Sequence, residues 1–259
     1  MALSASEIND LRSAKSLLEN PGLAAKISNY IGSPIEAGLK RLPEPVVATV
    51  NDIARKTIEK ALDAALLTMD KDDRRAPSNW RHKLAVAVTG AGGGAFGLPA
   101  LAIELPLSTT IMLRSIADIA RSEGENLHCP DARLQCLQVL ALGGHGNKDD
   151  GAEAGYFAVR AALAKSISEA AAHLAGKGAS QQGAPVIVRL ISQIASRFSI
   201  VVSEKAAAQA VPLVGAFGGA AINTLFIDHF QDMGRGHFTI RRLERLHGQE
   251  EVRRRYEEL

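Results

Sequence analysis

Two carboxylates lie where an acidic side chain is costly to place. Glu104 is the only formally charged residue between Leu84 and Leu113, and Asp228 directly follows an uncharged stretch from Ala206 to Ile227. An ionised carboxylate that leaves water without a partner costs several kcal/mol, so each requires a cation, a backbone amide or a helix end. We therefore expect structural ion pairs or helix-end interactions here, with ligand or metal binding as the alternative.

The nearest cation along the chain from Glu104 is Arg114, ten residues later. That separation is close to three helical turns, which disfavours an ion pair within one helix. We expect a neighbouring helix to supply an Arg, a Lys or a backbone amide to Glu104 instead.

A glycine-rich run from Gly92 to Gly97 has the form GxGxxG, but its context argues against a nucleotide site. A dinucleotide fold needs a strand, a phosphate-binding helix and a second strand that ends in an acid. The stretch from Leu84 to Val88 resembles such a strand, yet Pro99 and Pro106 interrupt the helix that should follow. A phosphate-binding loop is excluded because Leu98 and Pro99 occupy the positions of its Lys and its Ser or Thr.

Two loose groups of metal-type side chains match no standard ligand spacing. The first comprises His128, Cys129, Cys136 and His145, and the second comprises His229, Asp232 and His237 beside Asp228. We expect core cysteines and surface histidines in the first group and at most weak cation binding in the second. Since no GxSxG or HExxH motif occurs either, the sequence predicts no catalytic residue, no metal and no cofactor.

The elements that must position these residues are helices. Apolar residues recur at helical spacing in the ranges 58–69, 157–174, 187–201 and 238–246, and Gly248 closes the last of these. No segment shows the sustained alternation of a half-buried strand. The sequence therefore predicts an all-α, multi-helix bundle.

Capping residues mark several helix ends. Ser4 and Glu7 form a capping box for a first helix, and Asp150 with Glu153 begins a helix that Gly176 ends. Loops are expected at residues 32–45, 71–78, 143–151 and 176–185.

The two uncharged stretches are rich in glycine, which allows helices to approach closely in water or in lipid. Five glycines lie in the first half of Leu84 to Leu113, and three lie in Ala206 to Ile227. Each stretch is long enough to span a bilayer, but Pro99, Pro106 and Pro212 interrupt them. We interpret both as apolar helical hairpins that are buried in a soluble core or docked on, or inserted in, a membrane.

The two glycine-rich segments are similar to each other. Either an internal duplication or chance explains this similarity. A shift of 125 residues aligns three glycines with three glycines. A shift of 124 aligns Leu101, Ile103, Glu104, Ile116, Arg121 and Gly124 with Leu225, Ile227, Asp228, Ile240, Arg245 and Gly248. The duplication predicts a pseudo-symmetric all-α core.

Composition and charge limit the class of protein. The 259 residues are 46% hydrophobic and 22% charged, with 30 Lys and Arg against 28 Asp and Glu, which excludes disorder and disfavours nucleic-acid binding. Cys129 and Cys136 are expected on one face of a helix, too far apart to form a disulfide. The first twenty residues lack the apolar stretch of a secretory signal, so we expect a cytoplasmic protein.

Charges alternate in sign near the end of the chain. Seven arginines between Arg235 and Arg255 are interleaved with glutamates, which is typical of a solvated helix face. Contact with anionic lipid or with an acidic patch on a partner is the alternative.

A resemblance to the EcsC family of bacterial proteins is carried by Thr89 to Asn126, with the sequence TGAGGGAFGLPALAIELPLSTTIMLRSIADIARSEGEN. It joins a glycine-rich run to an acid-Leu-Pro element and a Met-Leu-Arg helix. The family's second signature is similar to Val211 to Ile227, VPLVGAFGGAAINTLFI. The resemblance covers about residues 53–248 and implies an EcsC-like all-α domain at 53–259 behind an N-terminal helical extension, residues 1–52. Its motif positions point to Glu104, Pro106, Arg114 and Asn223.

The EcsC family takes its name from a protein encoded beside an ABC-type transporter, and the resemblance brings no established catalytic residues. It favours a non-enzymatic bacterial accessory protein, on the inner face of the cytoplasmic membrane, that docks on a membrane or a transporter and binds lipid. We expect ligand or head-group contacts from Glu104, Arg114, Asn223 and Asp228. In a sharper hypothesis, a groove between the hairpins accepts an acyl chain and Arg114 meets its head group.

Two further classes of function remain open. One is a soluble hydrolase that uses Glu104 or Asp228 with a bound cation. The other is a soluble homo-oligomer with a purely structural role.

Overall fold

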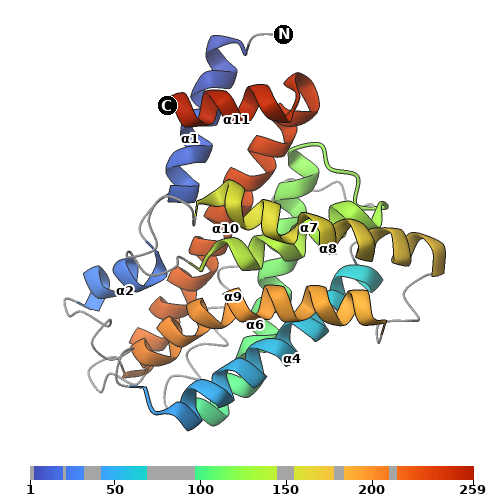
Figure 1. Ribbon diagram of the computed structural model, residues 1–259. Helices are drawn as coiled ribbons and strands as arrows, with labels where there is room; N and C mark the ends of the chain where they lie inside the picture. The colour runs from blue at the N-terminus through green and yellow to red at the C-terminus, as the bar shows by residue number, and fades with distance from the viewer. Residues whose placement is uncertain are drawn as a thin grey trace.

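The computed structural model describes residues 3–19, 22–31, 42–68, 97–144, 155–177, 184–209 and 215–259. Within these ranges all regular structure is helical (Figure 1). The helices are α1 (Ala5–Glu19), α2 (Leu23–Ile31), α4 (Glu44–Thr68), α6 (Gly97–Ser122), α7 (Pro130–Leu142), α8 (Tyr156–Lys177), α9 (Pro185–Gln209), α10 (Gly215–His247) and α11 (Gln249–Glu258). The predicted all-α bundle is confirmed.

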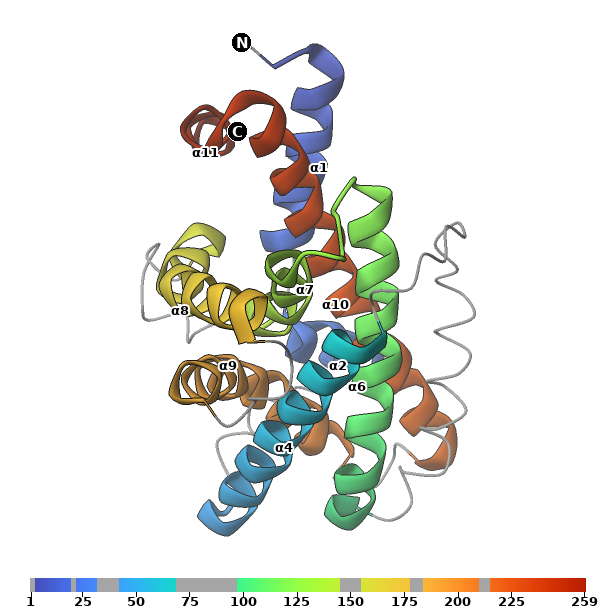
Figure 2. The ribbon, with the colours of Figure 1, turned by 90° about the vertical axis from the view of Figure 1, so that its right-hand side faces the viewer.

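Helices α6 and α10 form a parallel pair that runs through the height of the molecule (Figure 2). Gln231 donates to Ser115 at 2.8 Å and Thr239 donates to Glu123 at 3.4 Å, and both pairs are separated by 116 residues. The constant separation shows that the two helices keep one register along their contact. Helix α4 packs against α6 and α9, and α1 packs against the far part of α10.

Helix α7 lies at the centre of the bundle and contacts α4, α6, α8, α9 and α10. All its residues from Leu134 to Leu142 are buried. A helix that is buried on every side belongs in the interior, and α7 is such a helix from Leu134 to Leu142.

The predicted cap at the start of the chain is confirmed. Ser4 donates from its backbone nitrogen to Glu7 at 2.8 Å, and the Glu7 amide donates to the Ser4 hydroxyl at 3.3 Å, which is a capping box. Gly248 ends α10 with φ at +86°, as its predicted role as a closing glycine requires.

Gly124 and Gly248 are the two residues of the described ranges with positive φ, at +82° and +86°. They are the glycines that the 124-residue shift aligns, and each follows a long helix. The two helix ends differ otherwise, since Gly124 donates to Arg121 and Glu125 to Ala120 at the first, and Gly248 donates to Glu244 at the second. The duplication stays a prediction.

Three local predictions are wrong. Pro99 and Pro106 do not interrupt α6, because Pro99 lies in the first turn, where no backbone donor is needed, and Pro106 removes a single hydrogen bond within a well-buried helix. Gly176 does not end α8, which continues to Lys177. Cys129 and Cys136 do not share a helix face: Cys129 is exposed at the cap of α7 and Cys136 is buried within it, both as free thiols.

Several predictions fall outside the described residues. These are the cap at Asp150 and Glu153, the strand-like stretch from Leu84 to Val88, the GxGxxG run up to Phe96, the loop at 71–78 and the break at Pro212. Of the two predicted hairpins, the structure describes residues 97–113 in α6, and residues 206–209 and 215–227 in α9 and α10. The proposed division after residue 52 falls inside α4, which runs unbroken from Glu44 to Thr68.

Candidate functional site

Glu104 is buried inside the bundle and paired with a lysine from another helix. The Nζ atom of Lys205, on α9, donates to Oε1 of Glu104, on α6, at 2.6 Å, and the two side chains are 0% and 4% exposed. The expectation that a neighbouring helix supplies the partner is therefore confirmed. Nζ of Lys205 also lies 4.6 Å from the ring centroid of Phe226 on α10, so this pair joins three helices.

The Glu104–Lys205 pair is short of hydrogen bonds for its depth. Among the described residues, Oε2 of Glu104 has no hydrogen-bond partner. Burial lowers the pKa of Lys205, and the adjacent charge of Glu104 opposes that shift. A buried pair with a single hydrogen bond is costly to assemble and more costly to break, which indicates that it has a structural role.

The other predicted site residues do not gather around Glu104. Asn223 is fully buried on α10, one turn before Phe226 and on nearly the same side, which puts it in the same interior region. Asp228 is half-buried and lies two residues beyond Phe226, about 200° around the helix. Arg114 is exposed on α6. The four residues thus lie in at least three separate environments.

The outer face of α6 is apolar from Leu101 to Leu113 because Glu104, the only acid of this stretch, points inward. Ile103 is 79% exposed and Leu107 is 49% exposed. Arg114 is eleven residues beyond Ile103, so it lies on the same face of the helix and about 16 Å further along the axis. Between Gly97 and Leu113 this face carries no charge, and Arg114 is the first cation that follows.

A groove of about 560 Å³ separates this face of α6 from α4. Apolar side chains of Ile53, Ala102 and Pro106 line it. Its lining charges are two lysines and three acids, which are Lys56, Lys60, Asp52, Glu59 and Asp63. This groove between α4 and α6 adjoins the described part of the first glycine-rich segment, through Ala102 and Pro106.

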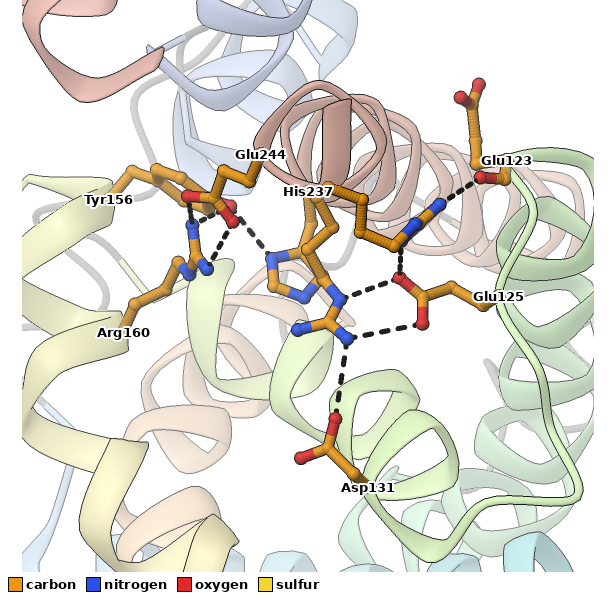
Figure 3. Close-up of polar contacts among 9 residues, drawn as sticks. Glu123, Glu125, Asp131, Tyr156, Arg160, His237 and Glu244 are labelled. Atoms are coloured by element: carbon orange, nitrogen blue, oxygen red, sulfur yellow. Dashed lines mark hydrogen bonds and ion pairs between the residues drawn. The ribbon is translucent and has the colours of Figure 1, made fainter. Parts of the chain in front are cut away.

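A second and more polar site lies where α8 meets the far half of α10 (Figure 3). Arg160 donates to both carboxylate oxygens of Glu244, at 2.7 and 2.8 Å, and to the hydroxyl of Tyr156 at 3.2 Å. That hydroxyl lies 2.9 Å from Nδ1 of His237. A guanidinium can only donate, so we assign the Tyr156 proton to His237 Nδ1 and the imidazole proton to Nε2.

Arginines of α10 continue this network to the turn between α6 and α7. Arg241 donates to both oxygens of Glu125, at 2.8 and 3.2 Å, and to Asp131 at 3.4 Å. Arg245 donates to Glu125 as well, and to the backbone oxygen of Glu123. We call the whole set the α8–α10 network; its members are Glu123, Glu125, Asp131, Tyr156, Arg160, His237, Arg241, Glu244 and Arg245.

The protonation states in the α8–α10 network follow from burial and charge. Burial raises the pKa of Tyr156, so its phenol stays protonated. Burial, together with the charges of Arg160 and Arg241, lowers the pKa of His237 well below its usual value, so the imidazole is neutral. Burial raises the pKa of Glu125, but the hydrogen bonds and charges of Arg241 and Arg245 outweigh it and lower the pKa overall.

A groove of about 500 Å³ opens beside this network, between α7, α8, α10 and α11. Its described lining carries three cations and three acids. These are Arg160, Arg241, Arg253, Asp131, Glu244 and Glu250. The remaining walls hold three glutamines, a serine and a few apolar side chains.

Sequence reasoning missed this site because its partners lie far apart in the chain. The arginines at 241, 242 and 245 were expected on a solvated face, but they bind acids on other elements. Arg242, for example, donates to Glu123 and to Asp10. The solvated-face prediction holds for Arg253, Arg254 and Arg255, which pair with glutamates of their own helix. The one available signal was the pair of acids in the turn at residues 123–125.

The predicted His229, Asp232 and His237 cluster does not form. His229 contacts the backbone oxygen of Gly143 at 3.0 Å, Asp232 accepts from Lys26 and Arg235, and His237 faces Tyr156. Over the described part of the chain, no group of three or more His, Cys, Asp or Glu side chains is placed to hold a metal ion.

One helix within the described ranges, α9, is long and apolar enough to cross a bilayer by length and composition. Half of its most apolar window is buried inside the protein. Core helices of soluble proteins pass the same test, so α9 carries no argument for a membrane span.

Comparison with known proteins identifies one family. The model of the EcsC protein family matches residues 6–243 of the 259. No curated protein and no solved structure matches the chain. The match covers both the interior around Glu104 and most of the α8–α10 network.

Proposed function

Because the chain belongs to the EcsC protein family, we propose that it is a non-enzymatic accessory protein that docks on the inner face of a bacterial membrane through the outer face of α6. The observation that carries this proposal is the inward turn of Glu104. Its pairing with Lys205 leaves Ile103 and Leu107 on an outer face without charge. A membrane-surface helix requires such an apolar stripe.

Electrostatics favour an anionic bilayer as the surface. Arg114 continues the Ile103 stripe, and each basic residue near an anionic membrane contributes about 1 kcal/mol. The adjoining groove adds nothing to this attraction, since its lining has three acids, Asp52, Glu59 and Asp63, against Lys56 and Lys60. Within the described residues Asp52 is paired with Lys56 at 2.7 Å and Glu59 with Arg55 at 2.8 Å.

The same geometry gives a place for lipid. The groove between α4 and α6 has apolar walls from Ile53, Ala102 and Pro106 and a charged edge, which matches an acyl chain with its head group outside. In this proposal Arg114 and Lys60 contact head groups, and Glu104 and Asn223 hold the helices together from inside.

Sedimentation with vesicles tests the proposal. The full chain is mixed with sucrose-loaded vesicles of phosphatidylglycerol and phosphatidylcholine, or of phosphatidylcholine alone. We expect the protein to pellet with the anionic vesicles, and we expect Ile103→Glu combined with Leu107→Glu to abolish pelleting. Arg114→Gln should weaken it about fivefold, since 1 kcal/mol corresponds to that factor.

Leu246→Glu is the matched control, since Leu246 is 61% exposed and lies at the C-terminal end of α10, outside the tested face of α6. It should pellet like the unaltered protein. The proposal would be overturned if Leu246→Glu lost binding as fully as the variant with Ile103→Glu and Leu107→Glu. It would also be overturned if the unaltered protein stayed in the supernatant, which would favour a soluble scaffold.

A further inference from the structure

The groove between α7, α8, α10 and α11 has the features of a ligand site, and membrane docking does not use it. Its volume of about 500 Å³ lies in the range of small-ligand pockets. Helix α11 and the end of α10, which border it, lie at the top of Figures 1 and 2, whereas α6 begins at the bottom. Ligand binding in this groove is therefore independent of the proposed membrane docking.

The charges of this groove exclude two classes of ligand. Its described lining has three arginines and three acids, so no net positive field attracts a polyanion. The walls are too polar for a hydrocarbon chain, since glutamines and charged groups make up most of them. A matching ligand must offer both hydrogen-bond donors and an acidic group.

Two arginines that line the groove have hydrogen-bond donors without a protein partner among the described residues. Arg253 donates from Nε to Glu257 at 2.9 Å, and Arg241 uses Nε and Nη2. Within the described chain this leaves both terminal nitrogens of Arg253 and the Nη1 nitrogen of Arg241 available. Two guanidinium groups beside one groove suit a carboxylate, which accepts bidentate hydrogen bonds.

The walls also present amide groups. Gln135 and Gln138 are only 8% and 2% exposed, and both line the groove from α7. Among the described residues, Oε1 of Gln135 has no hydrogen-bond partner. A buried amide oxygen requires an N–H donor, and a backbone amide of a peptide supplies one within reach of its own carboxylate.

The length of the groove agrees with an extended chain. Its α8 wall runs from Phe157 to Ser168, which is about 16 Å of helix. About five residues of extended peptide cover that distance. Ala161 and Ala164 lie on this wall, and their small side chains leave the groove open.

From this geometry we propose that the groove binds the carboxylate end of an extended peptide. Arg241 and Arg253 hold the carboxylate, Gln135 accepts from a backbone N–H, and the alanines of α8 accommodate the chain. The carboxylate is that of a chain terminus or of an acidic side chain.

Calorimetric titration of the full-length protein with pentapeptides tests this inference. The probes are acetyl-Ala-Ala-Ala-Ala-X, with X taken over all twenty residue types, each as the free acid and as the C-terminal amide. We expect free acids to bind at least tenfold more tightly than their amides if a terminus is recognised. If a side chain is recognised, amides with X as Asp or Glu bind as well as the acids and the other amides do not.

Matched variants locate the binding. Ala164→Leu fills the groove, whereas Ala162→Leu changes an exposed alanine of α8 that does not line it. Arg253→Gln removes a lining cation, whereas Arg254→Gln removes a neighbour that binds Glu251 and Glu258. We expect at least tenfold weaker binding from the first of each pair and no change from the second.

Three results would overturn the inference. The first is no binding by any peptide. The second is an affinity of acetate or inorganic phosphate equal to that of the best peptide, which would show a simple anion site. The third is unchanged affinity in the Ala164→Leu and Arg253→Gln variants.

Discussion

The interior around Glu104 and the α8–α10 network bury charge in opposite ways. Glu104 and Lys205 form one pair with one hydrogen bond, and their side chains are 4% and 0% exposed. In the network, Glu125 is 5% exposed but accepts from both Arg241 and Arg245. The first arrangement leaves a charge without a partner when one residue is lost, whereas the second shares Glu125 between two arginines.

The difference extends to the surface of the molecule. Pairing Glu104 internally removes the only charge of residues 97–113 from solvent, so the outer face of α6 is apolar. The network instead leaves part of its charged groups beside an open groove. One region is thus suited to a lipid surface and the other to a polar ligand, and the following predictions test how separate they are.

Breaking the single pair should have the largest effect on stability. Lys205→Met leaves an uncompensated carboxylate in the interior, which costs about 3–5 kcal/mol. We expect urea unfolding to show that loss in the free energy of unfolding. Adding Glu104→Gln should restore most of it, because a neutral pair of similar volume needs no counter-charge. A loss below about 1 kcal/mol for Lys205→Met would show that water reaches Glu104.

Breaking one link of the network should cost less. In Arg241→Gln, Glu125 keeps Arg245 as a partner, so we expect a loss of about 1–2 kcal/mol. The double variant Arg241→Gln with Arg245→Gln should lose more than the sum of the two single variants, by about 0.5–3 kcal/mol. Strict additivity in this double-mutant cycle would show that the arginines do not share Glu125.

Local sequence patterns predicted the helices and several of their ends because these depend on near neighbours. The capping box of Ser4 and Glu7 spans three residues, and Gly248 ends α10 through its own backbone conformation. The same local rules misplaced breaks at Pro106 and Gly176. Tertiary packing overrides propensity there, since a buried helix face tolerates the loss of one hydrogen bond.

The sequence predicted that Glu104 needs an internal partner, because a single acid in an apolar stretch indicates this. It did not predict the α8–α10 network, because each of its pairs joins two residues that are far apart in the chain. An acid within an apolar stretch already required an internal partner, but nothing local identifies Lys205, which is 101 residues away. The pairing of Glu125 with Arg241 spans 116 residues and that of Arg160 with Glu244 spans 84. Such contacts follow from how α6, α8 and α10 pack, which no single stretch of sequence encodes.

Acid should weaken the network through His237. Burial lowers the pKa of His237 below its usual 6.5, so below pH 6.5 the unfolded chain binds a proton that the folded one excludes. Stability is therefore complete above pH 6.5 and falls as the pH drops toward the folded pKa, by at most about 1.4 kcal/mol per pH unit. Melting temperatures between pH 7.5 and 5.5 should fall for the unaltered protein and less for His237→Gln. Exposed His128, changed to Gln, is the control and should leave the slope unchanged.

A comparison of helix ends, which includes the smallest expected effect, tests whether the two regions share a common plan. Gly124 and Gly248 have φ of +82° and +86°, but ψ at Gly248 is 151°, in a region essentially restricted to glycine. We therefore expect Gly124→Ala to cost about 1 kcal/mol and Gly248→Ala to cost more, about 1–3 kcal/mol. Sterics do not change this order, since a Cβ at Gly248 meets nothing within 4 Å and one at Gly124 lies 3.5 Å from Nη2 of Arg245, an ordinary contact. Gly176→Ala, in helix α8 with open space around it, should instead stabilise by up to about 0.5 kcal/mol. Urea unfolding of the three variants decides the matter: a larger loss at Gly248 would show that the two helix ends differ in conformation, whereas equal losses would fit a duplicated helix end.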